Sequence, residues 1–215
     1  MDRKESIAYL LGALRDGNLY ESKKHNVYRI RIYQKNKTWL KIIDNLFSKV
    51  IGEKTIWLKD PRKDLWYIQI GKKHLYEKIR KIVKSSYEIP EVIKNSSLNC
   101  QVEYVRGFFD AEGGILRIEN YEHNKILLQE KLQDIRINFG QINKESLNFI
   151  KMVLEKLSIS SGKICGPYFK NNNSKPFYQL NIYGIKNLIK FHDFVGTLHP
   201  LKQMRMKKII AYKRQ

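Results

Sequence analysis

The chain has 215 residues, enough for one domain or for two small domains of roughly 100 residues each. It carries 41 Lys and Arg residues against 21 Asp and Glu residues, a formal net charge of +20, which indicates a polyanionic partner such as nucleic acid. The composition argues against a membrane span, a disulfide framework and a zinc site, because apolar runs are short and there are only two cysteines.

The first part of the chain reads as a helix, two strands, a second helix, two more strands and a third helix. The opening segment SIAYLLGALRDGNLY predicts an apolar helix that ends at Asp16-Gly17, and a weak strand signal follows it. The segment VYRIRIYQ predicts a strand that ends at Gln34, and Asn36 is placed to cap an amphipathic helix that begins NKTWLKII. The strand signals KTIWL and LWYIQI and the helix signal GKKHLYEKI complete this part.

The second part repeats this order after a Ser-rich linker at 85–97, SSYEIPEVIKNSS. The segment YVRGFFDAEGGI predicts a helix that ends at Glu112, 96 residues after Asp16, and its two glycines are typical of a C-terminal cap. A strand ends at Gln141, Asn143 caps the next helix, and GKICGPYF, KPFYQLNIY and GIKNLIKFH follow in order. The segment ENYEHNKILLQEK is additional, and it predicts a hairpin extension or a surface loop.

The repeat gives the two helix-end acids a joint meaning. One acid at the end of a core helix is most often incidental, but two in equivalent places can meet if the helices pack closely. Small residues four apart, Ala8 with Gly12 and Gly107 with Ala111, would allow such an approach. Neighbouring carboxylates repel unless a proton or a cation bridges them, and oxygen-only ligands suit Mg²⁺. In a strongly basic chain, this pattern suggests phosphodiester hydrolysis.

These features resemble the LAGLIDADG homing endonuclease family in its monomeric, two-motif form. The resemblance covers nearly the whole chain and rests on YLLGALRDG, VRGFFDAEG, the repeat and the ending HPLKQMRMKKI. It implies an α+β fold of two pseudo-symmetric αββαββα subdomains, with saddle-shaped antiparallel sheets packed through the two motif helices. The N-terminal subdomain would span 1–84, the linker 85–97 and the C-terminal subdomain 98–215.

The resemblance also implies a catalytic site that cuts DNA. The acids would bind Mg²⁺, with Mn²⁺ or Ca²⁺ able to take the same place, the strand-end glutamines would organise water, and a lysine would lie near the scissile phosphates. The implied catalytic residues are Asp16, Glu112, Gln34, Gln141 and Lys202, and the implied metal ligands are Asp16, Glu112 and the backbone carbonyls of Arg15 and Ala111. A solvated lysine on an amphipathic helix is the alternative interpretation of Lys202.

The first motif departs from the family pattern by one residue. Gly12 and Asp16 are four positions apart, whereas Gly107 and Glu112 are five apart, and one residue is about 100° of helix rotation. A register kept from Gly12 would put Gly17 at the acid position. We favour Asp16 as the ligand, with a locally adjusted last helical turn.

Strand alternation predicts which side chains face the DNA. On the predicted strands, Arg, Asn, Gln and Tyr alternate with buried aliphatic residues, although an ordinary solvated strand face would show the same alternation. The DNA-binding residues that we expect are Arg29, Arg31, Tyr33, Lys35, Trp57, Lys59, Gln69, Arg117, Asp134, Arg136, Asn138, Lys163, Tyr168, Lys170, Gln179 and Asn181.

The implied function is cleavage of both strands of a long, asymmetric double-stranded DNA target, leaving short 3′ overhangs. We expect an intron-encoded monomer, intracellular, either cytoplasmic in a prokaryote or organellar, with no signal peptide and no membrane partner. An intron maturase that binds RNA and a DNA-binding regulator without cleavage are alternatives, because charge and stacking aromatic residues would serve either of them.

Overall fold

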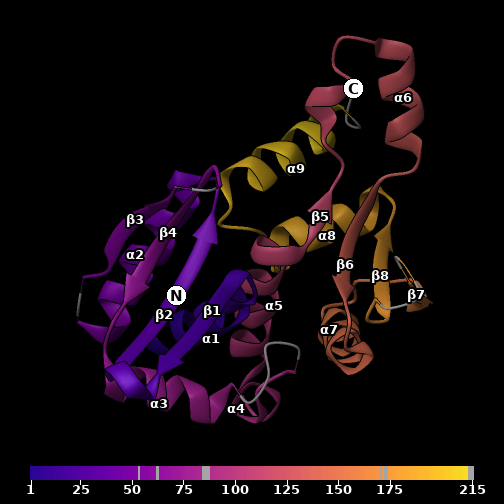
Figure 1. Ribbon diagram of the computed structural model, residues 1–215. Coiled ribbons are helices and arrows are strands. Elements are labelled where there is room, and N and C mark those ends of the chain that lie inside the picture. The colour runs from indigo at the N-terminus through magenta and orange to yellow at the C-terminus, as the bar shows by residue number, and fades with distance from the viewer. Residues whose placement is uncertain (53, 62, 84–87, 170, 172–173, 213–215) are drawn as a thin grey trace. The chain divides into compact units, whose positions relative to one another are not determined.

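The protein is described by a computed structural model that covers residues 1–215 except 53, 62, 84–87, 170, 172–173 and 213–215. Asp16, Lys125 and Gln133 are described by their backbone alone, and Lys170, one of the expected DNA-binding residues, lies outside the described residues. The chain forms two compact units, Met1–Ala111 and Glu112–Gln215. Each contains a four-stranded antiparallel sheet and several helices (Figure 1), so the α+β fold class is confirmed.

The first unit has the strand order β1-β2-β4-β3 in its sheet, and all neighbouring strands are antiparallel. Its elements are α1 (Arg3–Ala13), the 3₁₀ turn η1 (Leu14–Asp16), β1 (Gly17–Ser22), η2 (Lys23–His25), β2 (Val27–Gln34), α2 (Lys37–Ile51), β3 (Ile56–Asp60), β4 (Leu65–Ile70), α3 (Lys73–Ile82), α4 (Glu91–Lys94) and α5 (Leu98–Glu112), whose last residue opens the second unit.

The second unit repeats this order as β5-β6-β8-β7, which confirms the predicted internal repeat. Its elements are β5 (Gly114–Ile115), η3 (Ile118–Asn120), α6 (Lys125–Gln133), β6 (Arg136–Gln141), α7 (Lys144–Lys156), β7 (Cys165–Tyr168), β8 (Phe177–Tyr183), α8 (Ile185–Phe194) and α9 (Pro200–Tyr212).

Local sequence explains where the two long sheet-packing helices begin. The Asn36 side chain accepts a hydrogen bond from the Trp39 amide at 2.9 Å, and Asn143 accepts one from the Glu145 amide at 2.9 Å. Each cap satisfies one of the amides that a helix start leaves without an intrahelical partner. Both predicted caps are therefore confirmed, and α2 and α7 each follow directly on the strand that ends in glutamine.

Within the first unit, α1 and α5 pack backbone against backbone through two glycines. A Cβ built on Gly12 would lie 2.2 Å from the Tyr104 carbonyl oxygen, and one on Gly107 would lie 2.1 Å from the Tyr9 carbonyl oxygen. Neither site has room for a side chain. This confirms that small residues let the two motif helices approach each other, and it accounts for the grouping of α5 with the first unit. The subdomain boundaries at 84 and 98 stay a prediction.

Two local expectations were wrong. The additional segment after β5 forms η3 and the helix α6 rather than a hairpin or a loop, because Asn124 caps it by accepting from the Leu127 amide at 3.1 Å. The glycines after Glu112 form no left-handed cap, because the chain turns directly into β5, where Gly114 leaves room for Asn138. The linker at 85–97 stays a prediction, and its described part includes the short helix α4 with buried Ile93.

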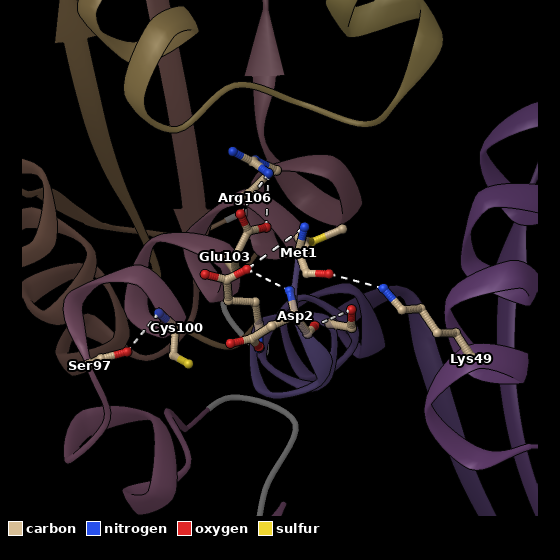
Figure 2. Close-up of polar contacts among 9 residues, drawn as sticks. Met1, Asp2, Lys49, Ser97, Cys100, Glu103 and Arg106 are labelled. Carbon is tan, nitrogen blue, oxygen red and sulfur yellow. Dashed lines mark hydrogen bonds and ion pairs between the residues drawn. The ribbon is translucent and has the colours of Figure 1, made fainter.

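A buried acid on α5 should make the stability of the protein depend on pH. Figure 2 shows Glu103 beside Met1 and Asp2, with its carboxylate accepting from Arg106 Nη1 at 2.7 and 3.0 Å. Burial raises the pKa of Glu103 from 4.5 to about 7, with Arg106 opposing this rise and Glu5 adding to it. The native state therefore holds a proton that the unfolded chain releases near pH 4.5.

It follows that this group stabilises the fold most at low pH, and that its contribution falls between about pH 4.5 and about pH 7. We expect Glu103→Gln, which stays neutral, to flatten the pH dependence of the unfolding free energy in this window, by at most about 3 kcal/mol. Urea denaturation at several pH values measures it. Parallel pH profiles for the variant and the wild-type protein would contradict the prediction.

Candidate active site and nucleic-acid interface

Glu112 lies where α5 ends and the chain turns into β5. Its side chain is exposed to solvent, although the ten residues of α5 from Cys100 to Asp110, other than Arg106, are buried. The Gln141 amide nitrogen donates to Glu112 Oε2 at 3.3 Å. The structure therefore brings together two of the predicted catalytic residues, an acid at a helix end and an amide at a strand end.

The two strand-end glutamines are anchored in the same way. Gln34 Oε1 accepts from the backbone amide of Lys35 at 2.8 Å, and Gln141 Oε1 accepts from the backbone amide of Ile142 at 2.7 Å. Each bond fixes the side-chain amide group through its oxygen, and the NH₂ group is the donating end of such an amide. In Gln141 this NH₂ group donates to Glu112.

Lys202 lies in the first turn of α9 and reaches the residue that follows Glu112. Its side chain is buried, and its Nζ donates to the Gly113 carbonyl oxygen at 2.7 Å. A fully solvated lysine is thereby excluded for this structure. His199, just before α9, is also buried, and burial together with Lys202 lowers its pKa to about 4. At neutral pH, His199 is therefore uncharged.

The shortened first motif is compensated by a change of helix type. α1 ends at Ala13, and Leu14–Asp16 form the 3₁₀ turn η1, whereas α5 stays α-helical to Glu112. A 3₁₀ helix rises about 2.0 Å per residue instead of about 1.5 Å. The four steps from Gly12 to Asp16 thus cover about 7.5 Å, the same as the five steps from Gly107 to Glu112.

The rotation about the helix axis is also nearly recovered by η1. A 3₁₀ step turns the chain by about 120° and an α step by about 100°, so the mismatch falls from about 100° to about 40°. Along the helix axis, the backbone of Asp16 therefore lies as far from Gly12 as that of Glu112 lies from Gly107. The two rotations about the axis differ by about 40°. This supports the expected local adjustment of the last turn, and the role of Asp16 as a ligand stays a prediction.

Two polar contacts, one from α5 to α1 and one from α5 to η1, occupy equivalent places but differ in chemistry. Tyr9 Oη donates to Asp110 Oδ2 at 2.6 Å, and Trp39 Nε1 donates to Tyr9 Oη at 2.9 Å. At the equivalent place, Arg15 Nη2 donates to Tyr104 Oη at 2.7 Å. Tyr104 follows Tyr9 by 95 residues, and Asp110 follows Arg15 by the same number. Burial raises the pKa of Tyr9 well above its usual value, so its hydroxyl stays protonated and donates.

One face of the first sheet carries a connected set of polar and aromatic side chains. Arg31 on β2 lies opposite Gln69 on β4, and Arg31 Nε donates to Gln69 Oε1 at 2.7 Å. The guanidinium of Arg31 also lies 5.3 Å from the Tyr67 ring centre, and the rings of Tyr33 and Tyr67 contact each other in a tilted arrangement with their centres 5.0 Å apart. The expected residues on this face are joined by three that the sequence analysis missed, namely Asn18, Tyr20 and Tyr67.

Trp57 and Lys59 lie on the opposite face of the same sheet. Trp57 is paired with buried Ile68, and its Nε1 donates to Asp44 on α2 at 2.9 Å. Lys59 lies two residues further along β3, on the same face as Trp57, and its ammonium lies 5.8 Å from the Trp66 ring centre. The register therefore separates both residues from the Arg31 face, and we leave them out of the proposed interface. Lys35 is exposed just beyond the end of β2.

The second sheet carries a similar polar face. Arg136 and Asn138 on β6 lie opposite Tyr183 and Asn181 on β8, and Gln179 follows on the same face. Asn181 is only 7% exposed, whereas Tyr183, which the sequence analysis missed, is 45% exposed. Four of the expected residues, Arg117, Asp134, Arg136 and Asn138, line one cleft of about 450 Å³ beside β5. The exposed Tyr168 lies on β7, and the exposed Lys163 lies just before it.

The described donors suit a hard divalent cation. Glu112 offers a solvent-exposed carboxylate, and a group of three or more His, Cys, Asp or Glu side chains that could hold a metal does not occur among the described residues. Carboxylate and carbonyl oxygens prefer Mg²⁺, Mn²⁺ and Ca²⁺. In the described part of the chain, no helix has the length and apolar character needed to cross a membrane.

Comparison with known proteins points to one group. Residues 99–196 match the family described as LAGLIDADG-like domain. The chain is 24% identical to the homing endonuclease I-ApeI of Aeropyrum pernix, over 96% of this chain and 87% of the relative. It is 20% identical to I-DmoI in complex with DNA and Mn, with a TM-score of 0.64 over 91% of this chain and 98% of that chain.

I-DmoI has also been solved with DNA and Ca, and a variant of it with its target DNA and Mg. A similar fold occurs in full-length DUF199/WhiA from Thermatoga maritima, which is 17% identical with a TM-score of 0.61 over 99% of this chain and 61% of that chain. The fold is therefore shared by proteins of more than one kind, and the site must carry the argument for function.

Proposed function

We propose that the chain is a LAGLIDADG homing endonuclease that hydrolyses both strands of a long, asymmetric double-stranded DNA target. The observation that carries the proposal is the group around the end of α5. Exposed Glu112 accepts from Gln141, and Lys202 donates to the carbonyl of the next residue. An acid, an amide and a lysine thus converge on one helix end in a chain of net charge +20.

In this proposal, Glu112 and Asp16 hold a divalent cation, Mg²⁺ in the cell, with help from the backbone carbonyls of Ala111 and Arg15. The bound cation would polarise the attacking water and stabilise charge on the leaving oxygen. Gln141 keeps the Glu112 carboxylate in place and offers an NH₂ group for hydrogen bonding. Lys202, which donates to the Gly113 carbonyl from its buried position, would contact the scissile phosphate.

The polar faces of the two sheets would bind the DNA. Arginine, asparagine and glutamine can pair with base edges in a major groove, which admits β-ribbons, and the tyrosines supply apolar contact. The two faces differ, with Arg31, Tyr67 and Gln69 in the first unit against Arg136, Asn138 and Gln179 in the second. Different faces read different half-sites, so the target would be asymmetric. We further propose that cleavage leaves short 3′ overhangs and that an intron encodes the protein.

A cleavage assay tests this function directly. Sequences that flank the gene, joined as they would be without the intron, are cloned in a plasmid and incubated with the protein, with and without Mg²⁺. We expect linear plasmid only when Mg²⁺ is present, and no linear product from a plasmid that lacks the joined sequence. Binding of the joined sequence with no cleavage in either Mg²⁺ or Mn²⁺ would overturn the nuclease proposal in favour of a binding protein.

A further inference from the structure

Three cationic side chains of α9 each contact a different acceptor in the segment 113–122, which follows Glu112. Lys202 donates to the carbonyl of Gly113 at 2.7 Å, and Lys208 donates to Glu122 Oε1 at 2.7 Å. Between them, Arg205 Nε donates to both carboxylate oxygens of Glu119, at 2.9 and 3.1 Å, and its Nη2 donates to Oε1. The three cations are spaced by three residues, so one side of α9 is fastened along this segment (Figure 1).

The middle contact has the stronger geometry of the two ion pairs. Arg205 binds Glu119 with two nitrogens, which is the fork arrangement that a guanidinium makes with a carboxylate. The Arg205 side chain is 15% exposed, whereas that of Lys208 is 40% exposed, and exposed ion pairs contribute little. The hydrogen bonds from Arg205 also lower the pKa of Glu119.

Arg205 lies about one helical turn from Lys202 on the same side of α9. The helix α9 packs on β5 and η3, and its Met206 and Ile209 are buried. Because a helix behaves as a rigid element, the ion pair that holds Arg205 in place also holds Lys202 in place. The same ion pair holds Glu119 in place, and with it the segment 113–119 that follows Glu112.

We propose that the Glu119–Arg205 ion pair is a positioning pair, which fixes the Lys202 ammonium against the end of α5 for cleavage. The inference rests on the proposed function, since it assigns no role to the pair outside that site. Neither residue needs to touch DNA. The pair acts through the helix, whereas Lys208–Glu122, one turn further on, only extends the contact.

The test compares Arg205→Met with Lys208→Met in the full-length protein. Each variant removes one positive charge and one ion pair from α9, but only Arg205 lies next to Lys202. Protein and target DNA are pre-bound, Mg²⁺ is added, and the cleavage rate of each strand is followed, with the Kd for DNA measured separately. We expect Arg205→Met to slow one strand about tenfold to a hundredfold, because a shift of about 1 Å can slow chemistry a hundredfold. The Kd should rise no more than for Lys208→Met.

A rescue experiment separates positioning from direct DNA contact. The exchanged pair Glu119→Arg with Arg205→Glu should recover most of the lost rate, since the ion pair is restored while the cation has moved. Wild-type cleavage with an unchanged rate for Arg205→Met would overturn this inference alone, whereas absent wild-type cleavage would overturn the proposed function. If Arg205→Met does not fold, Glu119→Gln, which breaks the same pair, gives the same two readings.

Discussion

A Glu112→Gln variant should bind its DNA target with the affinity of the wild-type protein but cleave it at least about a hundredfold more slowly. The side chain keeps its size, and its oxygen can still accept from Gln141. It loses the negative charge that a divalent cation needs, and glutamine is a much weaker ligand for such an ion. The exposed position of Glu112 means that little else depends on this charge.

The measurement is a single-turnover cleavage rate at saturating Mg²⁺, with DNA binding followed in Ca²⁺ by fluorescence anisotropy. Glu155→Gln is a matched control, because it removes one exposed carboxylate from α7 in the same unit. Its cleavage rate should match that of the wild-type protein. Cleavage by Glu112→Gln at the wild-type rate would remove Glu112 from the site.

The second large effect should come from Gly107→Ala, which we expect to lower the unfolding free energy by at least about 2 kcal/mol. The added Cβ would lie 2.1 Å from the Tyr9 carbonyl oxygen and 3.0 Å from the Ala13 amide nitrogen. These are backbone atoms of α1, so no side chain can rotate away to make room. The helices would have to separate, and the buried Tyr9–Asp110 hydrogen bond would be strained.

Urea denaturation followed by far-ultraviolet circular dichroism measures this loss. Gly71→Ala is the matched control, because a Cβ there meets its nearest atom, the Tyr28 carbonyl oxygen, at 3.8 Å, which is ordinary contact. Its denaturation midpoint should stay close to that of the wild-type protein. Equal midpoints for the two variants would mean that α1 and α5 do not depend on the close approach at Gly107.

Elements whose signal is local could be predicted from the sequence. Asn36 and Asn143 cap helices because a side chain binds an amide two or three positions later, and such contacts need no distant partner. The strand at Val27–Gln34 follows from strict alternation of aliphatic and polar residues. The apolar residues of α6 were harder to interpret, because a short nine-residue helix depends on the elements that it packs against.

The parts of the site that could not be predicted depend on contacts between distant residues. Trp57 is neighboured by apolar residues on both sides, so alternation could not show which face α2 would cover. Lys202 looked like any lysine of an amphipathic helix, and only the folded unit shows its bond to Gly113. The pairing of Arg205 with Glu119 joins residues 86 positions apart, beyond the reach of any local pattern.

The 3₁₀ turn at Leu14–Asp16 has a consequence for how such chains evolve. Deleting one residue from an α-helix rotates all later residues by about 100° about the helix axis. Such a rotation would disrupt a site that depends on a side chain at the helix end. In this chain the 3₁₀ turn offsets the shorter spacing, because three 3₁₀ steps span about the length of four α-helical steps. A spacing one residue shorter can therefore end at nearly the same backbone position when the last turn is 3₁₀. The family match over 99–196 contains the motif of regular length and leaves out the shorter one. Searches for distant relatives should accordingly accept a glycine and an acid separated by three residues as well as by four.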